Sequence, residues 1–303
     1  MGGNMFLQPH GQQKSGGDIL SEEKHIRIYP LRCGSIRVSP KMAYGGELGL
    51  RGAVEMALCP DRARVELPVF AFLIEHPRGR LLFDCGWCRE ISPDGRYDVK
   101  AVRRILPERL AALYHPTLLK GEAIDERLAA LGLRAEDIDC VLISHLDPDH
   151  VSGIRHLTGA KRFLMAEEER FWSCRTVYAM REPKELWRDR PIDVFWYKGT
   201  PIGPNRWSYD LFGDGSVQLI NVPGHTDGQF AARIQHGSRF ALLTADAAYS
   251  PRSWEEMIVP GFGFNRLAQR KSLEWIRAEA ALAGCAAVLA SHDPGISGDV
   301  IVL

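Results

Sequence analysis

The sequence predicts a single α/β domain. Short apolar runs of strand length alternate with segments of helical period, and this arrangement is repeated in two halves of the chain. No linker separates the halves, so we expect one continuous domain over residues 25–303. The length of 303 residues, with 45% apolar and 25% charged side chains, is ordinary for a globular protein with a sizeable core. Residues 1–24 are rich in Gly, Gln and Ser, and we expect them to form a flexible N-terminal arm.

The first predicted elements are strands. Residues 25–38 carry β-branched and apolar side chains at strand spacing. Residues 65–86 contain two apolar runs, and the Pro-Arg-Gly sequence at 77–79 between them favours a turn. A segment of helical period follows at 98–115, and Pro107 within it is expected to kink or split the helix.

A helix, two strands and a helical turn complete the first half. Residues 123–133 form a short amphipathic pattern that ends at Gly132, as helices commonly do. Residues 139–144 form a buried strand, 161–166 form another, and 167–174 have the composition of a helical turn.

Residues 175–215 have weak periodicity and many aromatic and proline residues. We expect an excursion with short elements, which is either a lid or pocket wall or an ordinary packed loop layer. Its aromatic residues are Tyr178, Trp187, Phe195, Trp196, Tyr197, Trp207 and Tyr209.

The second half repeats the alternation. A strand at 216–224 leads into a loop, and residues 229–246 form a predicted hairpin with its turn at 236–238. A long amphipathic helix is expected at 264–284, and 286–291 is the final predicted strand.

Composition argues against nucleic acid and membrane partners. Lys+Arg and Asp+Glu each total 38, and neither a long basic run nor an apolar run of bilayer-spanning length occurs. No apolar stretch of signal-peptide length begins the chain, so we expect a cytoplasmic protein with free thiols among its seven cysteines. The Cys-x-x-Cys pair of Cys85 and Cys88 lacks the following helix start that a thioredoxin-like redox site needs.

Seven residues of metal-binding type follow the ends of four apolar strands. They are His145, Asp147, Asp149 and His150 after the strand at 139–144, then His225, Asp246 and His292 after three later strands. Strand ends of one sheet converge, and open α/β sheets place ligands there, so this pattern favours a metal site. The remaining histidines are expected to be ordinary surface or core residues: His10, His25, His76, His115, His156 and His236.

The segments that carry these residues, SHLDPDH, PGHTDG, TADAAY and SHDPG, together resemble the metallo-β-lactamase superfamily. The loop of that family reads H-x-H-x-D-H, and a distant His, a bridging Asp and a last His follow it. Within the superfamily the sequence is similar to the N-acyl-homoserine lactonase group, through LPVFAFLIEHPRGRLLFDCGW and the segment that starts at Asp246. The resemblance runs from about residue 26 to residue 295.

The resemblance implies an αββα sandwich, in which two mixed β-sheets are flanked by helices and two metal ions lie at one edge of the sheets. It assigns His145, Asp147 and His225 to the first ion, Asp149, His150 and His292 to the second, and Asp246 to a bridge between them. Tyr249 matches the active-site tyrosine of the family. Zinc is the expected metal.

Asp147 stands where the family has a histidine. A carboxylate binds zinc at about the distance of an imidazole nitrogen, so the first site need not be lost. The side chain is shorter, so the metal or the loop must shift, or a water must intervene. Two divalent ions, three aspartates and a bridging hydroxide also sum to a neutral cluster, a weaker Lewis acid in which manganese or iron(II) competes with zinc. Pro148 biases the backbone of Asp147 toward an extended conformation.

The preferred interpretation is a hydrolase that opens a small lactone or cleaves an ester by means of a metal-bridging hydroxide. The first metal and the Tyr249 hydroxyl would stabilise the oxyanion, and Asp149 would carry the proton to the leaving alkoxide. The alternative for Tyr249 is a buried structural tyrosine. Four apolar residues either line an acyl pocket or belong to the core: Trp254, Met257, Phe262 and Phe264.

Other functions stay open on the sequence alone. One is a metallohydrolase of another ester or thioester class. Another is a di-iron redox protein, because flavodiiron proteins share this fold and place a carboxylate at the position of Asp147, although no flavin-binding domain follows the sheet here. A non-catalytic binding protein that kept the fold is the third. The chain is expected to be a monomer or a homodimer.

Overall fold

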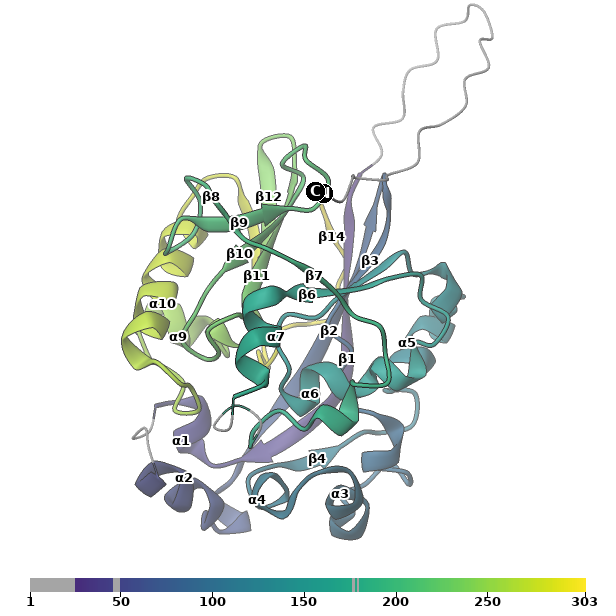
Figure 1. Ribbon diagram of the computed structural model, residues 1–303, viewed down its shortest axis with the longest axis vertical. Helices are drawn as coiled ribbons and strands as arrows, with labels where there is room; N and C mark the ends of the chain where they lie inside the picture. Colours follow the sequence, from purple (N-terminus) through teal and green to yellow (C-terminus); the bar gives the residue numbers. More distant parts are fainter. Residues whose placement is uncertain (1–24, 46–49, 176–177, 179) are drawn as a thin grey trace, which may run out of the picture.

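The computed structural model describes residues 25–45, 50–175, 178 and 180–303. Two mixed β-sheets pack against each other, and helices cover their outer sides (Figure 1). This arrangement is the αββα sandwich that the family resemblance implied. The predicted N-terminal arm, residues 1–24, lies outside the described residues.

The first sheet has eight strands in the order β14-β1-β2-β3-β5-β6-β7, with β4 paired to β1. Its strands are β1 (Arg27–Val38), β2 (Val65–His76), β3 (Gly79–Phe83), β4 (His115–Thr117), β5 (Cys140–Leu142), β6 (Phe163–Ala166), β7 (Asp193–Phe195) and β14 (Ile301–Val302). The pairs from β14 to β3 are antiparallel, whereas β3, β5, β6 and β7 are parallel. Parallel neighbours send their carboxyl ends to the same edge of the sheet.

The second sheet has six strands in the order β13-β12-β11-β10-β9-β8. They are β8 (Lys198–Gly199), β9 (Trp207–Asp210), β10 (Val217–Asn221), β11 (Phe230–His236), β12 (Arg239–Leu243) and β13 (Cys285–Leu289). Only the β12–β13 pair is parallel among the described pairings of this sheet.

The side-chain alternation of β2 explains why the sheets stack. Phe70, Phe72 and Ile74 point into the core between the two sheets, whereas Val69 and Ala71 belong to the core beneath the helices of the first sheet. A strand that is apolar on both faces must be covered on both faces, because successive side chains point to opposite sides. The continuous apolar run in this segment therefore requires a layer on each side of the first sheet.

Helices close the two outer faces. Side chains from the helices over the first sheet join its outer core, and those over the second sheet, such as Ile276, form a third cluster with Leu242 of β12. The helices are α1 (Pro40–Ala43), α2 (Leu50–Ala57), α3 (Val99–Ile105), α4 (Glu108–Ala111), α5 (Ile124–Ala130), α6 (Pro148–Val151), α7 (Glu167–Ser173), α9 (Pro251–Glu255) and α10 (Arg266–Ala280). Figure 1 shows α5 beside the first sheet and α10 along the outer side of the second. Short 3-10 helices lie at 61–63, 89–91, 135–137, 152–156, 184–186 and 245–247.

Two breaks in the helices agree with the sequence analysis. Pro107 caps α4 after α3 has ended at Ile105, so this proline splits the predicted helix as expected. Gly132 follows α5 with φ +73, a left-handed conformation that glycine adopts without strain.

The structure contains elements that the sequence did not predict. The segment 175–215 is more than a loop layer, because its strand β7 extends the first sheet and its strands β8 and β9 extend the second. Residues 286–291 do not hold the last strand, since β14 follows and pairs with β1. The helices α1 and α2 and the strand β4 were not predicted. Their short patterns carry too few turns or residues to give a periodic signal.

Among the described residues, none of the helices has both the length and the apolar character needed to cross a bilayer. The seven cysteines are free thiols, as predicted.

Candidate active site

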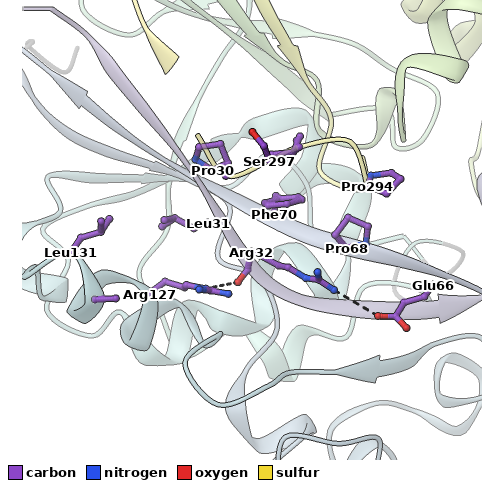
Figure 2. Close-up of a pocket in the computed structure, with 13 residues that line it drawn as sticks. Pro30, Leu31, Arg32, Glu66, Pro68, Phe70, Arg127, Leu131, Pro294 and Ser297 are labelled. Atoms are coloured by element: carbon purple, nitrogen blue, oxygen red, sulfur yellow. Dashed lines mark hydrogen bonds and ion pairs between the residues drawn. The ribbon is translucent and has the colours of Figure 1, made fainter. Parts of the chain in front are cut away.

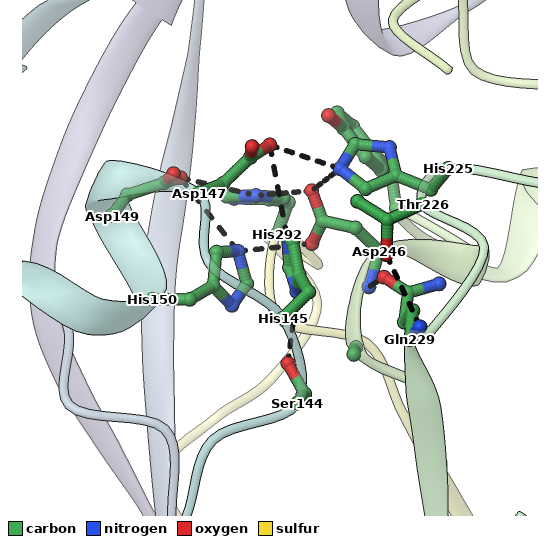
Figure 3. Close-up of polar contacts among 12 residues, drawn as sticks. Ser144, His145, Asp147, Asp149, His150, His225, Thr226, Gln229, Asp246 and His292 are labelled. Carbon is green, nitrogen blue, oxygen red and sulfur yellow. Dashed lines mark hydrogen bonds and ion pairs between the residues drawn. The ribbon is translucent and has the colours of Figure 1, made fainter. Parts of the chain in front are cut away.

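The structure brings the seven predicted ligand residues together at one edge of the sandwich (Figure 3). They form two adjoining groups, and the ligand atoms within each group lie within 4.8 Å of one another. The first group is His145, Asp147, His225 and Asp246; the second is Asp149, His150 and His292. Each of the seven is at most 2% exposed. Such a cluster of buried histidines and carboxylates offers ligands for two metal ions.

The loop after β5 places four of these side chains. Asp147 has the extended backbone that Pro148 was predicted to impose, with φ −63 and ψ 145, and it precedes α6. Pro148 then begins the helix, where its fixed φ suits the first position. The short helix α6 holds Asp149 and His150 on its single turn, so both reach the second group.

Backbone and carboxylate partners orient the imidazole rings of the second group. The Nδ1 atom of His292 lies 2.8 Å from the carbonyl oxygen of Pro68, which only accepts, so Nδ1 carries the proton. The Nδ1 atom of His150 lies 2.9 Å from a carboxylate oxygen of Asp84 and donates to it in the same way. Both Nε2 atoms therefore present a lone pair to the cluster, the orientation that a metal ligand needs.

Asp84 is a positioning residue that the sequence analysis missed. Besides binding His150, its carboxylate accepts hydrogen bonds from the backbone N–H and the hydroxyl of Ser144, each at 2.8 Å. The Ser144 hydroxyl lies 2.9 Å from Nδ1 of His145 and accepts its proton, because the hydroxyl hydrogen is already donated to Asp84. One buried carboxylate thus orients two of the ligand histidines. Asp84 has a left-handed backbone, with φ +61 directly after β3, but the sequence alone gave no signal of its role.

Two further buried side chains brace the loops of the site. The side-chain oxygen of Gln229 accepts the backbone N–H of Asp246 at 3.2 Å and so fixes the loop after β12. Glu169 on α7 accepts the backbone N–H of Leu146 at 3.0 Å and the hydroxyl of Thr226 at 2.7 Å. Burial raises the pKa of Glu169 to about 6. Through its two hydrogen bonds, Glu169 joins the loop after β5 to the loop that carries His225.

The pKa values of two buried carboxyl groups of the cluster, Asp149 and Asp246, are shifted in opposite directions. Burial raises the pKa of Asp149 above its usual value. Burial also acts to raise the pKa of Asp246, but the neighbouring His292 and His150 outweigh it and hold this pKa well below the usual range. Asp246 therefore stays ionised, whereas Asp149 takes up a proton more readily.

The second group fits a divalent metal ion. The Nε2 atoms of His150 and His292 are buried, lack a hydrogen-bond partner and lie beside carboxylate oxygens of Asp246 and Asp149. In the adjoining first group, Nε2 of His145 and one oxygen of Asp246 also lack a hydrogen-bond partner. Buried polar atoms without partners are costly, and a bound cation satisfies them. A set of imidazole nitrogens and carboxylate oxygens suits zinc, manganese or iron(II).

The first group differs because the guanidinium of Arg181 enters it. The Nε atom of Arg181 donates to one oxygen of Asp147 at 2.6 Å, and an Nη atom donates to the other oxygen at 2.5 Å. The same Nη atom contacts Nε2 of His225. Burial acts to raise the pKa of Asp147, but Arg181, His145 and His225 together outweigh it and hold this pKa well below the usual range. The charge balance predicted from the sequence omitted Arg181, which lies in the excursion 175–215 and had no recognisable signal.

The remaining predicted residues take different places. Tyr249 is buried, and its ring centre lies 4.7 Å from that of His292, at the second group. Trp254 belongs to the core beneath α10. The rings of Phe262 and Phe264 face the guanidinium of Arg181, with centres 4.2 and 5.1 Å from its central carbon. These two phenylalanines therefore form a wall of the site, and Trp254 does not.

A cavity of about 560 Å³ lies beside the site and not within it (Figure 2). Residues of β1 and β2 and the turn after His292 line it, among them Phe70 and Pro294. Pro68 lines the cavity and also accepts the hydrogen bond from His292 through its carbonyl oxygen. Arg32 and Glu66, which also line it, form an ion pair.

An αββα sandwich with a histidine and aspartate cluster at the ends of its strands defines a class of metal-dependent proteins. The model of the metallo-beta-lactamase superfamily matches residues 64–287, and the chain therefore belongs to this superfamily.

Two curated relatives that match the chain over most of its length are lactonases. The chain is 30% identical to the N-acyl homoserine lactonase AttM of Agrobacterium fabrum over 279 residues, which cover 89% of this chain and 94% of the relative. It is 28% identical to the N-acyl homoserine lactonase AttM of Azorhizobium caulinodans over 282 residues, with the same coverage of 89% and 94%.

Solved structures share the fold. One is an N-acyl homoserine lactone hydrolase with the product N-hexanoyl-L-homoserine bound at its catalytic metal centre, with a TM-score of 0.69 and 18% identity over 91% of this chain and 98% of that chain. Another is AidC, described as a dizinc quorum-quenching lactonase, with a TM-score of 0.60 and 15% identity over 90% of this chain and 89% of that chain. The family model thus confirms the predicted family, and the solved structures confirm the predicted fold.

Proposed function

We propose that the protein is a metal-dependent hydrolase that opens the ring of N-acyl homoserine lactones. The observation that carries the proposal is the second ligand group, in which Asp149, His150 and His292 meet beside the buried Tyr249. The lactonase relatives, which match the chain over most of its length, support the choice of a lactone as substrate. Quorum quenching, the removal of such lactones as signals, is the corresponding biological role.

Asp149, His150 and His292 would hold a divalent ion, with Asp246 beside them, and such an ion would supply Lewis acidity and lower the pKa of water. Zinc is the metal we propose, with manganese or iron(II) as competitors. The chain itself supplies the orientation. Asp84 and the Pro68 carbonyl keep the proton on Nδ1 of the two histidines, so that their Nε2 atoms face the ion.

Tyr249 provides a hydrogen-bond donor for the lactone carbonyl. Burial raises the pKa of its hydroxyl well above 10, and the nearby Asp246 raises it further. The hydroxyl therefore keeps its proton at neutral pH and donates to the carbonyl oxygen as negative charge develops there. A donor that is buried and fixed before the reaction costs little reorganisation in the transition state.

Asp149 is the group that carries a proton to the leaving alkoxide. It lies in the second group, where one of its oxygens is 3.4 Å from Nε2 of His292. It is also the carboxyl of the cluster whose pKa is raised, in contrast to Asp246. General acid catalysis by a positioned carboxyl group contributes roughly 10²–10⁴-fold to rate.

We also propose that the protein works in the cytoplasm on a small-molecule substrate. Seven free cysteines, four of them buried, fit a reducing compartment.

Hydrolysis of N-hexanoyl homoserine lactone tests the proposed function. The purified protein, loaded with zinc or manganese, should release one proton per turnover in a weakly buffered assay, and mass spectrometry should find the product heavier by one water. His292→Ala should abolish turnover, and His236→Ala on the distant β11–β12 hairpin should leave it unchanged. A parallel screen covers simple lactones, thioesters and phosphodiesters. Absence of lactone turnover with either metal would exclude the proposed substrate class.

A further inference from the structure

The guanidinium of Arg181 lies within the first ligand group and is held there by several contacts. Its side chain is 7% exposed, and all three of its nitrogens have partners. Two of them form the bidentate pair with Asp147, one of these also contacts Nε2 of His225, and the third donates to the backbone oxygen of His225 at 3.2 Å. Bidentate arginine–carboxylate pairs combine strength with a fixed geometry.

Aromatic rings hold this guanidinium in place. Phe262 and Phe264 lie over it, and the ring of Phe264 stacks on that of Tyr178 with centres 3.7 Å apart. The hydroxyl of Tyr178 in turn donates to Asp227 at 2.6 Å. A cation between aromatic faces gains cation–π attraction, which is largest where water is excluded. Packing and hydrogen bonds therefore both fix the position of Arg181.

Arg181 uses the atoms that a metal ion at the first group would need. The Nε2 atom of His225 has a single lone pair, which either accepts the proton of Arg181 or binds a metal. Both oxygens of Asp147 already accept strong hydrogen bonds from the guanidinium. An ion among these ligands would also lie against a permanent positive charge in a buried place, where repulsion is weakly screened.

The second group has no such competitor among the described residues. The Nε2 atoms of His150 and His292 have no hydrogen-bond partner, and their Nδ1 atoms are anchored by Asp84 and Pro68. The two groups are similar in ligand chemistry, but a guanidinium binds two ligand residues of the first group, whereas the Nε2 atoms of the second group face only the carboxylates of the cluster.

We propose that Arg181 takes the place of the first metal ion, so that the protein binds one divalent ion, at Asp149, His150 and His292. The inference rests on the metal-dependent hydrolase proposed above and specifies its metal content. It also gives Asp147 a role: a carboxylate at this position forms a bidentate ion pair with arginine, which a neutral imidazole cannot form. Arg181 then supplies a fixed positive charge where the lactonase resemblance implied a second ion.

Metal stoichiometry tests the proposal without any assay of activity. The full chain is loaded with zinc, freed of excess metal by desalting, and measured by mass spectrometry of the elements. The wild type should hold one equivalent, and Arg181→Met, which keeps an unbranched side chain but removes the donors, should hold two. Arg188→Met is the matched control, because Arg188 lies in the same segment with a side chain 60% exposed; it should hold one. With manganese, an exchange-coupled electron paramagnetic resonance spectrum should appear only in Arg181→Met.

Two variants on the wild-type background locate the ion and do not depend on the folding of Arg181→Met. His292→Ala should lose the single equivalent, whereas His225→Ala should keep it. Two equivalents with a coupled spectrum in the wild type, or loss of the ion in His225→Ala with retention in His292→Ala, would overturn the inference. One equivalent without lactone turnover would overturn the substrate class and leave the inference standing. No metal in any preparation would overturn both.

Discussion

Replacing Asp84 with asparagine isolates the contribution of one buried charge to the metal site. Asparagine has the same shape and tolerates the left-handed backbone found here, so φ +61 adds no strain. One amide oxygen can still accept the backbone N–H of Ser144. The amide nitrogen, however, would face the Ser144 hydroxyl and Nδ1 of His150, both of which donate to Asp84 in the structure. Three donors, the new amide N–H, the Ser144 hydroxyl and Nδ1–H of His150, would then face one another where a single carboxylate oxygen now accepts.

The expected response is a change of tautomer. His150 relieves the clash by moving its proton from Nδ1 to Nε2, which then points a hydrogen into the second ligand group. Loss of such a carboxylate partner typically costs 10- to 100-fold in metal affinity. That loss corresponds to about 1.4–2.8 kcal/mol of binding free energy.

Competition with a coloured chelator measures this affinity directly. Asp84→Asn should show zinc affinity reduced by about 10- to 100-fold, with circular dichroism of the wild type. Asp189→Asn, at a side chain 90% exposed, is the matched control and should leave the affinity unchanged. Wild-type affinity in a folded Asp84→Asn protein would refute the reasoning that Asp84 sets the tautomer of His150.

Three further predictions concern catalysis, the core and the thiols. Tyr249→Phe should lower kcat by about a hundredfold and change KM little, as measured by steady-state kinetics, because one oxyanion donor is lost. Phe72→Ala should cost about 3–5 kcal/mol of unfolding free energy in urea titrations, because this fully buried ring fills the core between the sheets. Iodoacetamide at pH 8 should label the exposed Cys174 in the native protein but neither Cys85 nor Cys88, since burial raises the pKa of Cys88 to about 11 and that of Cys85 well above its usual value.

Each of these predictions has a contrary outcome. Equal losses in kcat and substrate affinity for Tyr249→Phe would indicate a structural tyrosine. A loss of less than 1 kcal/mol in Phe72→Ala would show that the sheets repack around the gap. Rapid native labelling of both Cys85 and Cys88 would reopen a redox role for the pair.

The sequence was informative where physical patterns are local. Apolar runs precede each ligand, so an α/β domain and the grouping of ligands at strand ends were accessible from the local pattern. The αββα sandwich itself was implied by the family resemblance. Pro107 and Gly132 marked helix ends through their own backbone preferences. These features depend on neighbours within a few residues.

The features that were missed depend on contacts between distant residues. Asp84 reaches His150 across 66 positions, and Arg181 reaches Asp147 across 34 positions, so neither spacing forms a motif. Arg181 also lies in a segment without periodicity, whose short strands find their partners only when the sheets exist. The unusual aspartate at position 147 was visible in the sequence, but its partner was not.

The cluster joins the edges of two different sheets, since the loop after β5 belongs to the first and the loops after β10, β12 and β13 belong to the second. An ion that binds only when both sheets are docked behaves as a reversible cross-link. It stabilises the folded chain by about 4 kcal/mol when free metal exceeds the dissociation constant a thousandfold. The supply of metal in the cell would therefore govern how long each molecule survives proteolysis, in addition to whether it is active.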